Sequence, residues 1–216
     1  MAFLRIEEIF GERMSVSVLR LLAQVEGGLS GNETARRLGA QQSTVRKALE
    51  RLVARGLVTR TDVGRAASYM LDERREAVRG IVIPAFQAES ELRLKLWSDI
   101  VTLGGRVRPR PVALVLYGSI TKGVRSPRDI DLLVVVDSDT EIDRLRDQLA
   151  EAGERFETSY LLPLSPVLAP KRNLETALGE TLLQSVLRDG VLLYGEPVGA
   201  LRRMKRWHRT PDFVSA

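Results

Sequence analysis

Two aspartates two positions apart are the residues of this chain best suited to chemistry. Asp129 and Asp131 stand at the start of the apolar run LLVVV, which has the composition of a buried β-strand. Side chains two residues apart on a strand point to the same face, so both carboxylates should face one point in space. A convergent pair of carboxylates suits a hard cation such as Mg2+, which prefers oxygen ligands and leaves room for phosphates.

A glycine–serine pair precedes the aspartates and follows a second apolar run, VALVLY. Gly118 and Ser119 fall where this predicted strand ends and a short helix can begin, so their N–H groups can bind an anion. Lys122, Gly123 and Arg125 follow in the same loop, where the two cations either neutralise phosphate charge or are exposed loop charges. The loop and the carboxylates together could bind a nucleoside triphosphate through its metal and transfer part of it.

The pattern G-S-x-T-K-G followed by D-I-D resembles the DNA polymerase beta-type nucleotidyltransferase superfamily, over about residues 110–197. It is most similar to the minimal nucleotidyltransferase domains, whose usual motif is G-S-x-A-x-G…D-x-D; Thr121 replaces the usual alanine. The resemblance implies that Asp129 and Asp131 are catalytic and bind Mg2+. It also implies that the glycine–serine loop grips the outer phosphates of an NTP, ATP being the first candidate.

Active members of this superfamily usually add a third carboxylate from the following strand, which completes the metal site and activates the attacking hydroxyl. The segment ERFETSYLLPLSP predicts that strand, and Glu157 is the candidate third catalytic and metal-binding residue, with Glu154 as the alternative. Glu157 can equally be an exposed charge at the strand start. Without a third carboxylate, metal and nucleotide can bind while transfer fails.

The composition limits the other kinds of chemistry. The chain has 216 residues, enough for two modest domains, and contains no cysteine and one histidine. Disulfides and thiolate metal sites are therefore excluded, and a histidine-based zinc site or triad is not expected. Residues 1–14 lack the basic-then-apolar form of a signal peptide, and no apolar run approaches the length of a membrane span. We therefore expect a cytoplasmic protein. The net charge of +5 is compatible with nucleic acid without demanding it.

The N-terminal part predicts three helices followed by a β-hairpin. Helical spacing marks residues 15–26, Ser30 and Glu33 form a capping-box pattern before the second helix, and QSTVRKALERLVARG is the third. Residues 57–72 read as two strands around D-V-G-R. This order is that of a winged helix-turn-helix. It resembles the MarR/ArsR-type repressor domains over about residues 12–72, whose wing commonly reads G-R-x-x-x-Y-x-L, as G-R-A-A-S-Y-M-L does here.

That resemblance implies that the third helix enters the major groove of double-stranded DNA, with its first residues at the base edges. The candidate DNA-binding residues are Gln41, Gln42, Ser43, Thr44, Arg46 and Lys47 on the helix and Arg65 on the wing. Gln, Ser and Thr can read bases, while Arg and Lys mostly neutralise phosphates. The alternative is that the cations of this region form a solvated helix face, because winged helices also serve as protein-interaction modules.

We therefore expect an α+β protein with three parts: a winged-helix domain at 1–72, a helical connector at 73–108 and a small mixed-sheet nucleotidyltransferase domain at 109–216, ending in a basic tail. Pro84 should mark a kink or break in the connector. The connector is more apolar than a free linker needs, so it should pack against the C-terminal domain or a second subunit. A homodimer would suit DNA binding, since paired winged helices read two half-sites.

The predicted function is a DNA-binding regulator carrying a Mg2+-dependent nucleotidyltransferase domain, which moves a nucleoside monophosphate from an NTP to a hydroxyl acceptor on a protein, nucleic acid or small molecule. The alternative is a weak or inactive domain that acts as a nucleotide sensor or as one partner of a toxin–antitoxin pair. A third possibility is a basic two-domain protein with no retained activity.

Overall fold

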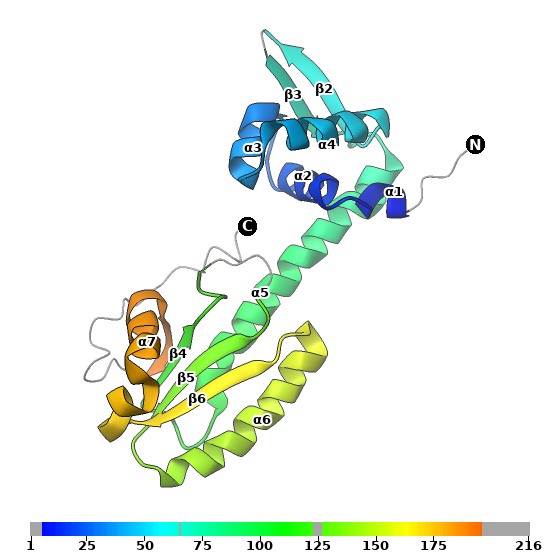
Figure 1. The fold of residues 1–216 in the computed structure, drawn as a ribbon. Helices are drawn as coiled ribbons and strands as arrows, with labels where there is room; N and C mark the ends of the chain where they lie inside the picture. Colours follow the sequence, from blue (N-terminus) through cyan, green and yellow to red (C-terminus); the bar gives the residue numbers. More distant parts are fainter. Residues whose placement is uncertain (1–5, 65, 123–126, 196–216) are drawn as a thin grey trace. The chain divides into compact units, whose positions relative to one another are not determined.

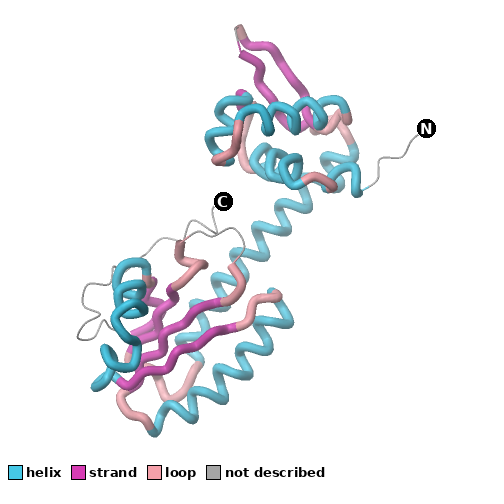
Figure 2. Tube along the Cα trace, viewed as in Figure 1, coloured by secondary structure: helices cyan, strands magenta, loops and turns pink. Residues whose placement is uncertain are grey.

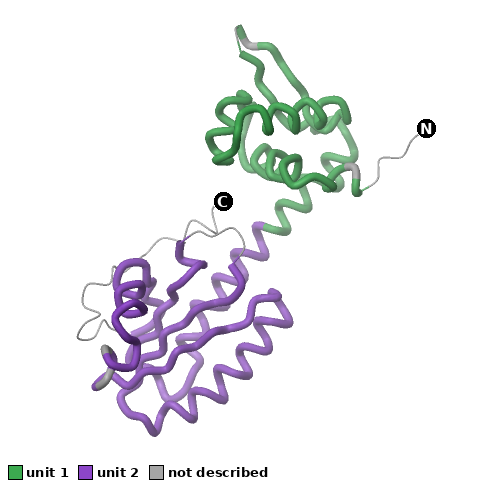
Figure 3. The backbone as a smooth tube through the Cα atoms, viewed as in Figure 1, with its two compact units in different colours: residues 1–89 green, residues 90–216 purple. Residues whose placement is uncertain are grey.

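The computed structural model describes residues 6–64, 66–122 and 127–195 (Figure 1). The chain divides into two compact units, residues 1–89 and 90–216 (Figure 3). The division falls inside the long helix α5 (Ile83–Arg106), so the residues expected to form a connector are shared between both units. Each unit is described by itself.

The first unit is a winged helix-turn-helix, as the sequence predicted. Its described helices are α1 (Ile6–Phe10), α2 (Arg13–Ala23), α3 (Gly31–Leu38) and α4 (Gln42–Ala54). Its described strands are β1 (Leu29–Ser30), β2 (Val58–Val63) and β3 (Ala66–Leu71), paired antiparallel in the order β1-β3-β2. Figure 2 shows β2 and β3 as a hairpin that projects from the helices. Arg65 lies outside the described residues.

Local sequence explains where α3 begins and ends. Ser30 caps its N-terminus, because its Oγ accepts a hydrogen bond from the N–H of Glu33 at 3.2 Å. The carboxylate of Glu33 accepts hydrogen bonds from the guanidinium groups of Arg36 and Arg37 on the same helix. Gly39 ends the helix in the left-handed region at φ 59°, which glycine adopts without strain. The next helix, α4, packs its buried leucines and valine against α2.

The chain leaves β3 through a buried aspartate and a short π-helix. Asp72 is buried and binds the guanidinium of Arg74, with Arg75 also in contact. The π-helix η1 (Val78–Val82) then runs directly into α5. Pro84 is the second residue of α5, and because η1 continues into α5, its missing N–H leaves the helical ladder one hydrogen bond short at this point. The structure shows no break at this proline, since Ile83 is helical, at φ −62° and ψ −51°, and the chain continues into α5.

The second unit is built on a mixed sheet, as predicted. In the described residues the strand order is β6-β5-β4-β7. The strands are β4 (Ala113–Tyr117), β5 (Ile130–Val136), β6 (Leu164–Pro170) and β7 (Val191–Gly195). Strands β5 and β6 are parallel, while β4 pairs antiparallel with both β5 and β7.

Helices cover both faces of this sheet. Leu132 and Val134 of β5 pack on the side of α5 and of α6 (Thr140–Tyr160), where they meet Phe156. Leu133 and Val135 pack on the opposite side, against α7 (Leu174–Asp189). Two covered faces explain why β4 and β5 are continuous apolar runs rather than alternating ones.

The strand predicted for ERFETSYLLPLSP is wrong over its first half. Helix α6 continues to Tyr160, and β6 begins only at Leu164. The reason is visible in the spacing of the buried residues Leu149, Ala152 and Phe156, which is helical and extends past the point where the sequence suggested a turn. Both Glu154 and Glu157 are therefore helical and exposed.

None of the helices in the described ranges is both long and apolar enough to cross a membrane.

Candidate functional site

The turn after β4 and the start of β5 form the candidate site. Tyr117, the last residue of β4, lies opposite Asp131 in the antiparallel register. Leu132 faces α6, so its neighbour Asp131 projects from the α7 face of the sheet, as Tyr117 does. Asp129 precedes the strand by one residue and is half-buried, like Asp131.

The backbone of the turn wraps the carboxylate of Asp131. Gly118 has φ +83°, and a Cβ at this position would lie 1.8 Å from Oδ2 of Asp131. The N–H of Ser119 donates a hydrogen bond to the same carboxylate. The hydroxyl of Thr121 donates to the carbonyl of Gly118 at 3.1 Å and closes the turn. Glycine is required here both for its conformation and for the space.

The two aspartates repel each other. The pKa of Asp131 is raised because partial burial disfavours its charged form and because Asp129 adds a like charge; the Ser119 N–H and Lys122 oppose this rise. Burial, followed by the charges of Asp131 and Asp129, raises the pKa of Tyr117 to about 12. A cation at this position would relieve the repulsion.

After the repulsion between the two aspartates, the buried hydroxyl of Ser119 is a second feature that points to a ligand. Its Oγ is buried and has no hydrogen-bond partner among the described residues. An unsatisfied buried hydroxyl costs about 1–3 kcal/mol, so such groups usually have a partner. In this turn, which also offers backbone N–H groups, a phosphate oxygen would supply one.

Lys122 adds a positive charge. Its Nζ lies 3.6 Å from Oδ2 of Asp189, the last residue of α7, and it also lowers the pKa of Asp131. Asp189 is itself paired with Arg188 at 2.9 Å, the main cause of its lowered pKa. Gly123 and Arg125, the other predicted phosphate-binding residues, lie outside the described residues.

Glu157, the predicted third carboxylate, does not lie beside Asp129 and Asp131. Glu157 lies on α6, which covers the face of the sheet opposite to Asp131. On β6, the neighbour of Asp131 in the parallel register is Ser165, and the strand LSPVLAP contains no Asp or Glu. Across the described part of the chain, no three His, Cys, Asp or Glu side chains gather as a metal site.

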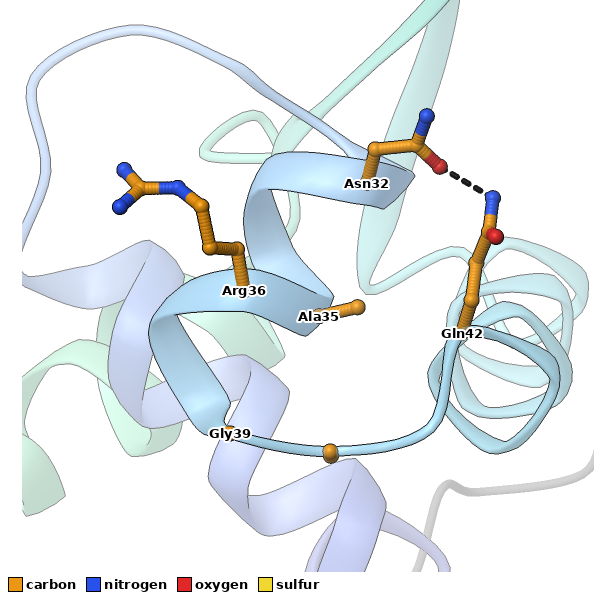
Figure 4. Close-up of a pocket in the computed structure, with 6 residues that line it drawn as sticks. Asn32, Ala35, Arg36, Gly39 and Gln42 are labelled. Atoms are coloured by element: carbon orange, nitrogen blue, oxygen red, sulfur yellow. Dashed lines mark hydrogen bonds between the residues drawn. The ribbon is translucent and has the colours of Figure 1, made fainter.

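The predicted DNA-binding residues of α4 do lie together. Gln41 is the N-cap residue, and the other five occupy the first two turns; all six are exposed. Arg46 forms an ion pair with Glu50 at 3.4 Å. The side-chain amide of Gln42 donates a hydrogen bond to Oδ1 of Asn32 on α3 (Figure 4). The sequence did not single out Asn32 or Asp189, because each meets its partner only through the fold.

Two family models match the chain, one over the predicted winged-helix domain and one over the predicted nucleotidyltransferase domain. Residues 12–67 match the model of the MarR family, and residues 95–190 match the model of the nucleotidyltransferase domain. No curated protein matches the chain. The sequence matches show a MarR-type winged helix joined to a nucleotidyltransferase domain, as the motifs predicted.

Several solved structures similar to parts of the chain are of regulators. The adhesin competence repressor of Streptococcus pyogenes is 19% identical with a TM-score of 0.36, over 42% of this chain and 66% of that one. A transcriptional regulator of Thermotoga maritima is 29% identical with a TM-score of 0.32, over 44% and 66%. A MarR-family regulator of Rhodococcus sp. RHA1 is 18% identical with a TM-score of 0.32, over 72% and 81%. The chain thus spans just under two thirds of the first two relatives.

Proposed function

We propose that this winged-helix regulator binds double-stranded DNA through the start of α4, and that its nucleotidyltransferase domain binds a nucleoside triphosphate with Mg2+ and acts as a nucleotide sensor. ATP is the first candidate for the nucleotide. The observation that carries the proposal is the packing of the Gly118–Ser119 turn around Asp131, beside a buried hydroxyl that lacks a partner among the described residues.

The residues present fit Mg2+. Asp129 and Asp131 would hold it, since Mg2+ commonly binds through one or two carboxylates together with phosphates and water. When bound, the ion neutralises phosphate charge. The Ser119 hydroxyl and the N–H groups that follow Ser119 in the turn would donate to phosphate oxygens, and Lys122 would add a positive charge beside them.

Binding is better supported than transfer. A transferase of this type must also deprotonate the attacking hydroxyl, and a carboxylate beside Asp131 on β6 would do so. Ser165 occupies that register position, and a neutral hydroxyl is a poor base at neutral pH. Transfer to a hydroxyl acceptor, including one on a partner protein, is the second candidate, and the Asp129–Asp131 pair favours it.

One experiment separates the two candidates. The full-length protein is incubated with Mg2+ and each α-labelled NTP, alone and with cell extract, while thermal unfolding is recorded in parallel. Sensing predicts a Mg2+-dependent thermal shift with at least one NTP and no covalent label. Transfer predicts label on an acceptor that disappears in the Asp129→Asn, Asp131→Asn variant. Absence of both label and shift would refute both candidates.

A homodimer is part of the proposal for DNA binding, because two winged helices read two half-sites. Helix α5 carries two exposed leucines, Leu92 at 50% and Leu94 at 54%, which pairing with a second copy would cover. Light scattering of the eluting protein should give twice the chain mass of 24.1 kDa. A single-chain mass at micromolar concentration would remove the dimer.

A further inference from the structure

The first turns of α3 and α4 are linked by a pair of side-chain amides. Asn32 is the second residue of α3, and Gln42 is the first residue of α4. The Nε2 group of Gln42 donates a hydrogen bond to Oδ1 of Asn32. Figure 4 shows the two amides facing each other across the space between the helices, with Arg36 directed elsewhere.

The hydrogen bond leaves Gln42 with a defined set of remaining groups. One N–H of its amide is used by Asn32, so the second N–H and the carbonyl Oε1 are left for a ligand. In the major groove, adenine presents an acceptor at N7 next to a donor at N6, and a glutamine amide binds this pair through its own N–H and C=O. The groups left on Gln42 match adenine when Asn32 takes the N–H that points away from Oε1, because the bidentate contact uses Oε1 and the N–H beside it.

Anchoring the Gln42 side chain to Asn32 also reduces the conformational entropy that this side chain loses when DNA binds. A free glutamine side chain is among those that lose the most rotamer freedom when they are immobilised. Gln42 is exposed on α4 and is held at its tip by a residue of another helix. Part of that loss is therefore incurred in the free protein, before DNA binds.

The amide pair is open to a ligand. It borders a hollow of about 280 Å³ whose other lining residues are Ala35, Arg36, Gly39 and Ala40. Gln42 and Arg46 are one helical turn apart and so share a face of α4. A base contact by Gln42 and a phosphate contact by Arg46 are thus compatible with a single placement of the helix.

We infer that Asn32 is a specificity-determining positioning residue, which holds Gln42 so that its amide reads one adenine in the major groove. The inference rests on the proposed DNA binding by α4 and adds the base and the residue that orients its reader. Asn32 itself need not touch DNA.

The test uses the full-length protein and double-stranded DNA selected from a library with a randomised core. In the selected duplex, each conserved adenine is replaced in turn by 7-deazaadenine, which lacks the N7 acceptor. At one position the wild type should lose roughly 5- to 150-fold in affinity, the cost of leaving one buried donor without its acceptor. The affinity of Gln42→Ala should not change when 7-deazaadenine replaces adenine at that position. Asn32→Ala should lose most of the wild type's discrimination between the two bases.

Two further readouts separate positioning from a general structural role. The melting temperature of Asn32→Ala and the slope of its affinity against salt should equal those of the wild type, since phosphate contacts set that slope. Asn32→Asp keeps the acceptor oxygen and should restore discrimination against 7-deazaadenine, although its added charge lowers overall affinity.

The outcomes are distinct. Discrimination by Asn32→Ala equal to that of the wild type would overturn the inference while leaving DNA binding intact. A selected site with no position that depends on Gln42 would do the same. Failure of the folded wild type to bind any duplex, even at low salt, would overturn both the inference and the proposed DNA binding.

Discussion

A Cβ on residue 118 would lie 1.8 Å from Oδ2 of Asp131, so the turn after β4 approaches this carboxylate as closely as only glycine allows. The contact joins the end of one strand to the start of its neighbour, although the two residues are separated by the whole loop. It places the N–H of Ser119 on the carboxylate and holds the proposed anion-binding turn beside the candidate metal ligand. The predictions for the C-terminal unit depend on this contact.

Substituting Gly118 should damage the site more than substituting another glycine of positive φ. Gly118→Ala must accommodate both a positive φ and displacement of Asp131, whereas Gly179→Ala meets only the unfavourable backbone, since no atom lies within 4 Å of its Cβ position. The backbone term is about 1–3 kcal/mol in each variant. Chemical denaturation should therefore show a larger loss for Gly118→Ala, and only this variant should lose the NTP-dependent thermal shift. Equal losses with the shift retained would contradict the described packing.

Removing the charge of Asp131 should stabilise the protein without ligand. Its folded-state pKa is raised, so the ionised carboxylate is disfavoured in the fold, and stability falls as pH rises through the unfolded and then the folded pKa. At neutral pH the wild type carries the whole penalty. Asp131→Asn should raise the free energy of unfolding by at most about 1 kcal/mol, because the side chain is only partly buried. The control Asp143→Asn, at the exposed start of α6, should not stabilise. A destabilised Asp131→Asn would count against the repulsion.

Mg2+ should compete with protons at the same carboxylate. Because the pKa of Asp131 is raised, protonation begins at a higher pH than for an ordinary aspartate and removes a metal ligand. The Mg2+ concentration needed for half of the NTP-dependent thermal shift should rise as the pH falls from neutral to mildly acidic. A constant Mg2+ requirement over this range would argue that Asp131 does not bind the ion.

The cap of α3 should contribute measurably to the winged-helix unit. Ser30→Ala removes the acceptor for the Glu33 N–H and should lower stability by about 1 kcal/mol. Ser17→Ala is the matched control, since Ser17 lies inside α2 and its hydroxyl bonds only to the carbonyl of Arg13. Urea unfolding followed by circular dichroism should show a loss for Ser30→Ala that exceeds that of the control.

Cations on α4 should control the salt dependence of DNA affinity. Arg46→Ala with Lys47→Ala removes two exposed positive charges, so the slope of log affinity against log salt should fall by about 2 if both contact phosphate. Arg146→Ala, an exposed cation of α6, measures the effect of net charge alone. A double variant with the slope of the wild type would remove these residues from the DNA interface.

Local patterns predicted most of the fold. The helical period of α2, the cap at Ser30 and the glycine of the wing each lie within a few neighbouring residues, so the sequence carries them directly. The two apolar strands around the glycine–serine turn were equally clear, because a sheet covered on both faces needs no alternation.

The errors and omissions came from relationships that one segment does not contain. Glu157 was expected on a strand because the residues around it include aromatic and apolar ones, yet Phe156 continues the buried face of α6. Asp189 meets Lys122, and Asn32 meets Gln42, only after helices from different parts of the chain have packed. No local pattern marks such partners.

The most direct test of the account is calorimetric titration of the full-length protein with Mg2+ and ATP, then with the other NTPs. The wild type should bind at least one NTP saturably and only when Mg2+ is present. The folded Asp129→Asn, Asp131→Asn variant should lose the Mg2+-dependent part of that binding. A folded wild type that binds no NTP, or a double variant that binds as tightly as the wild type, would contradict the assignment of Gly118, Ser119 and Asp131 to a nucleotide site.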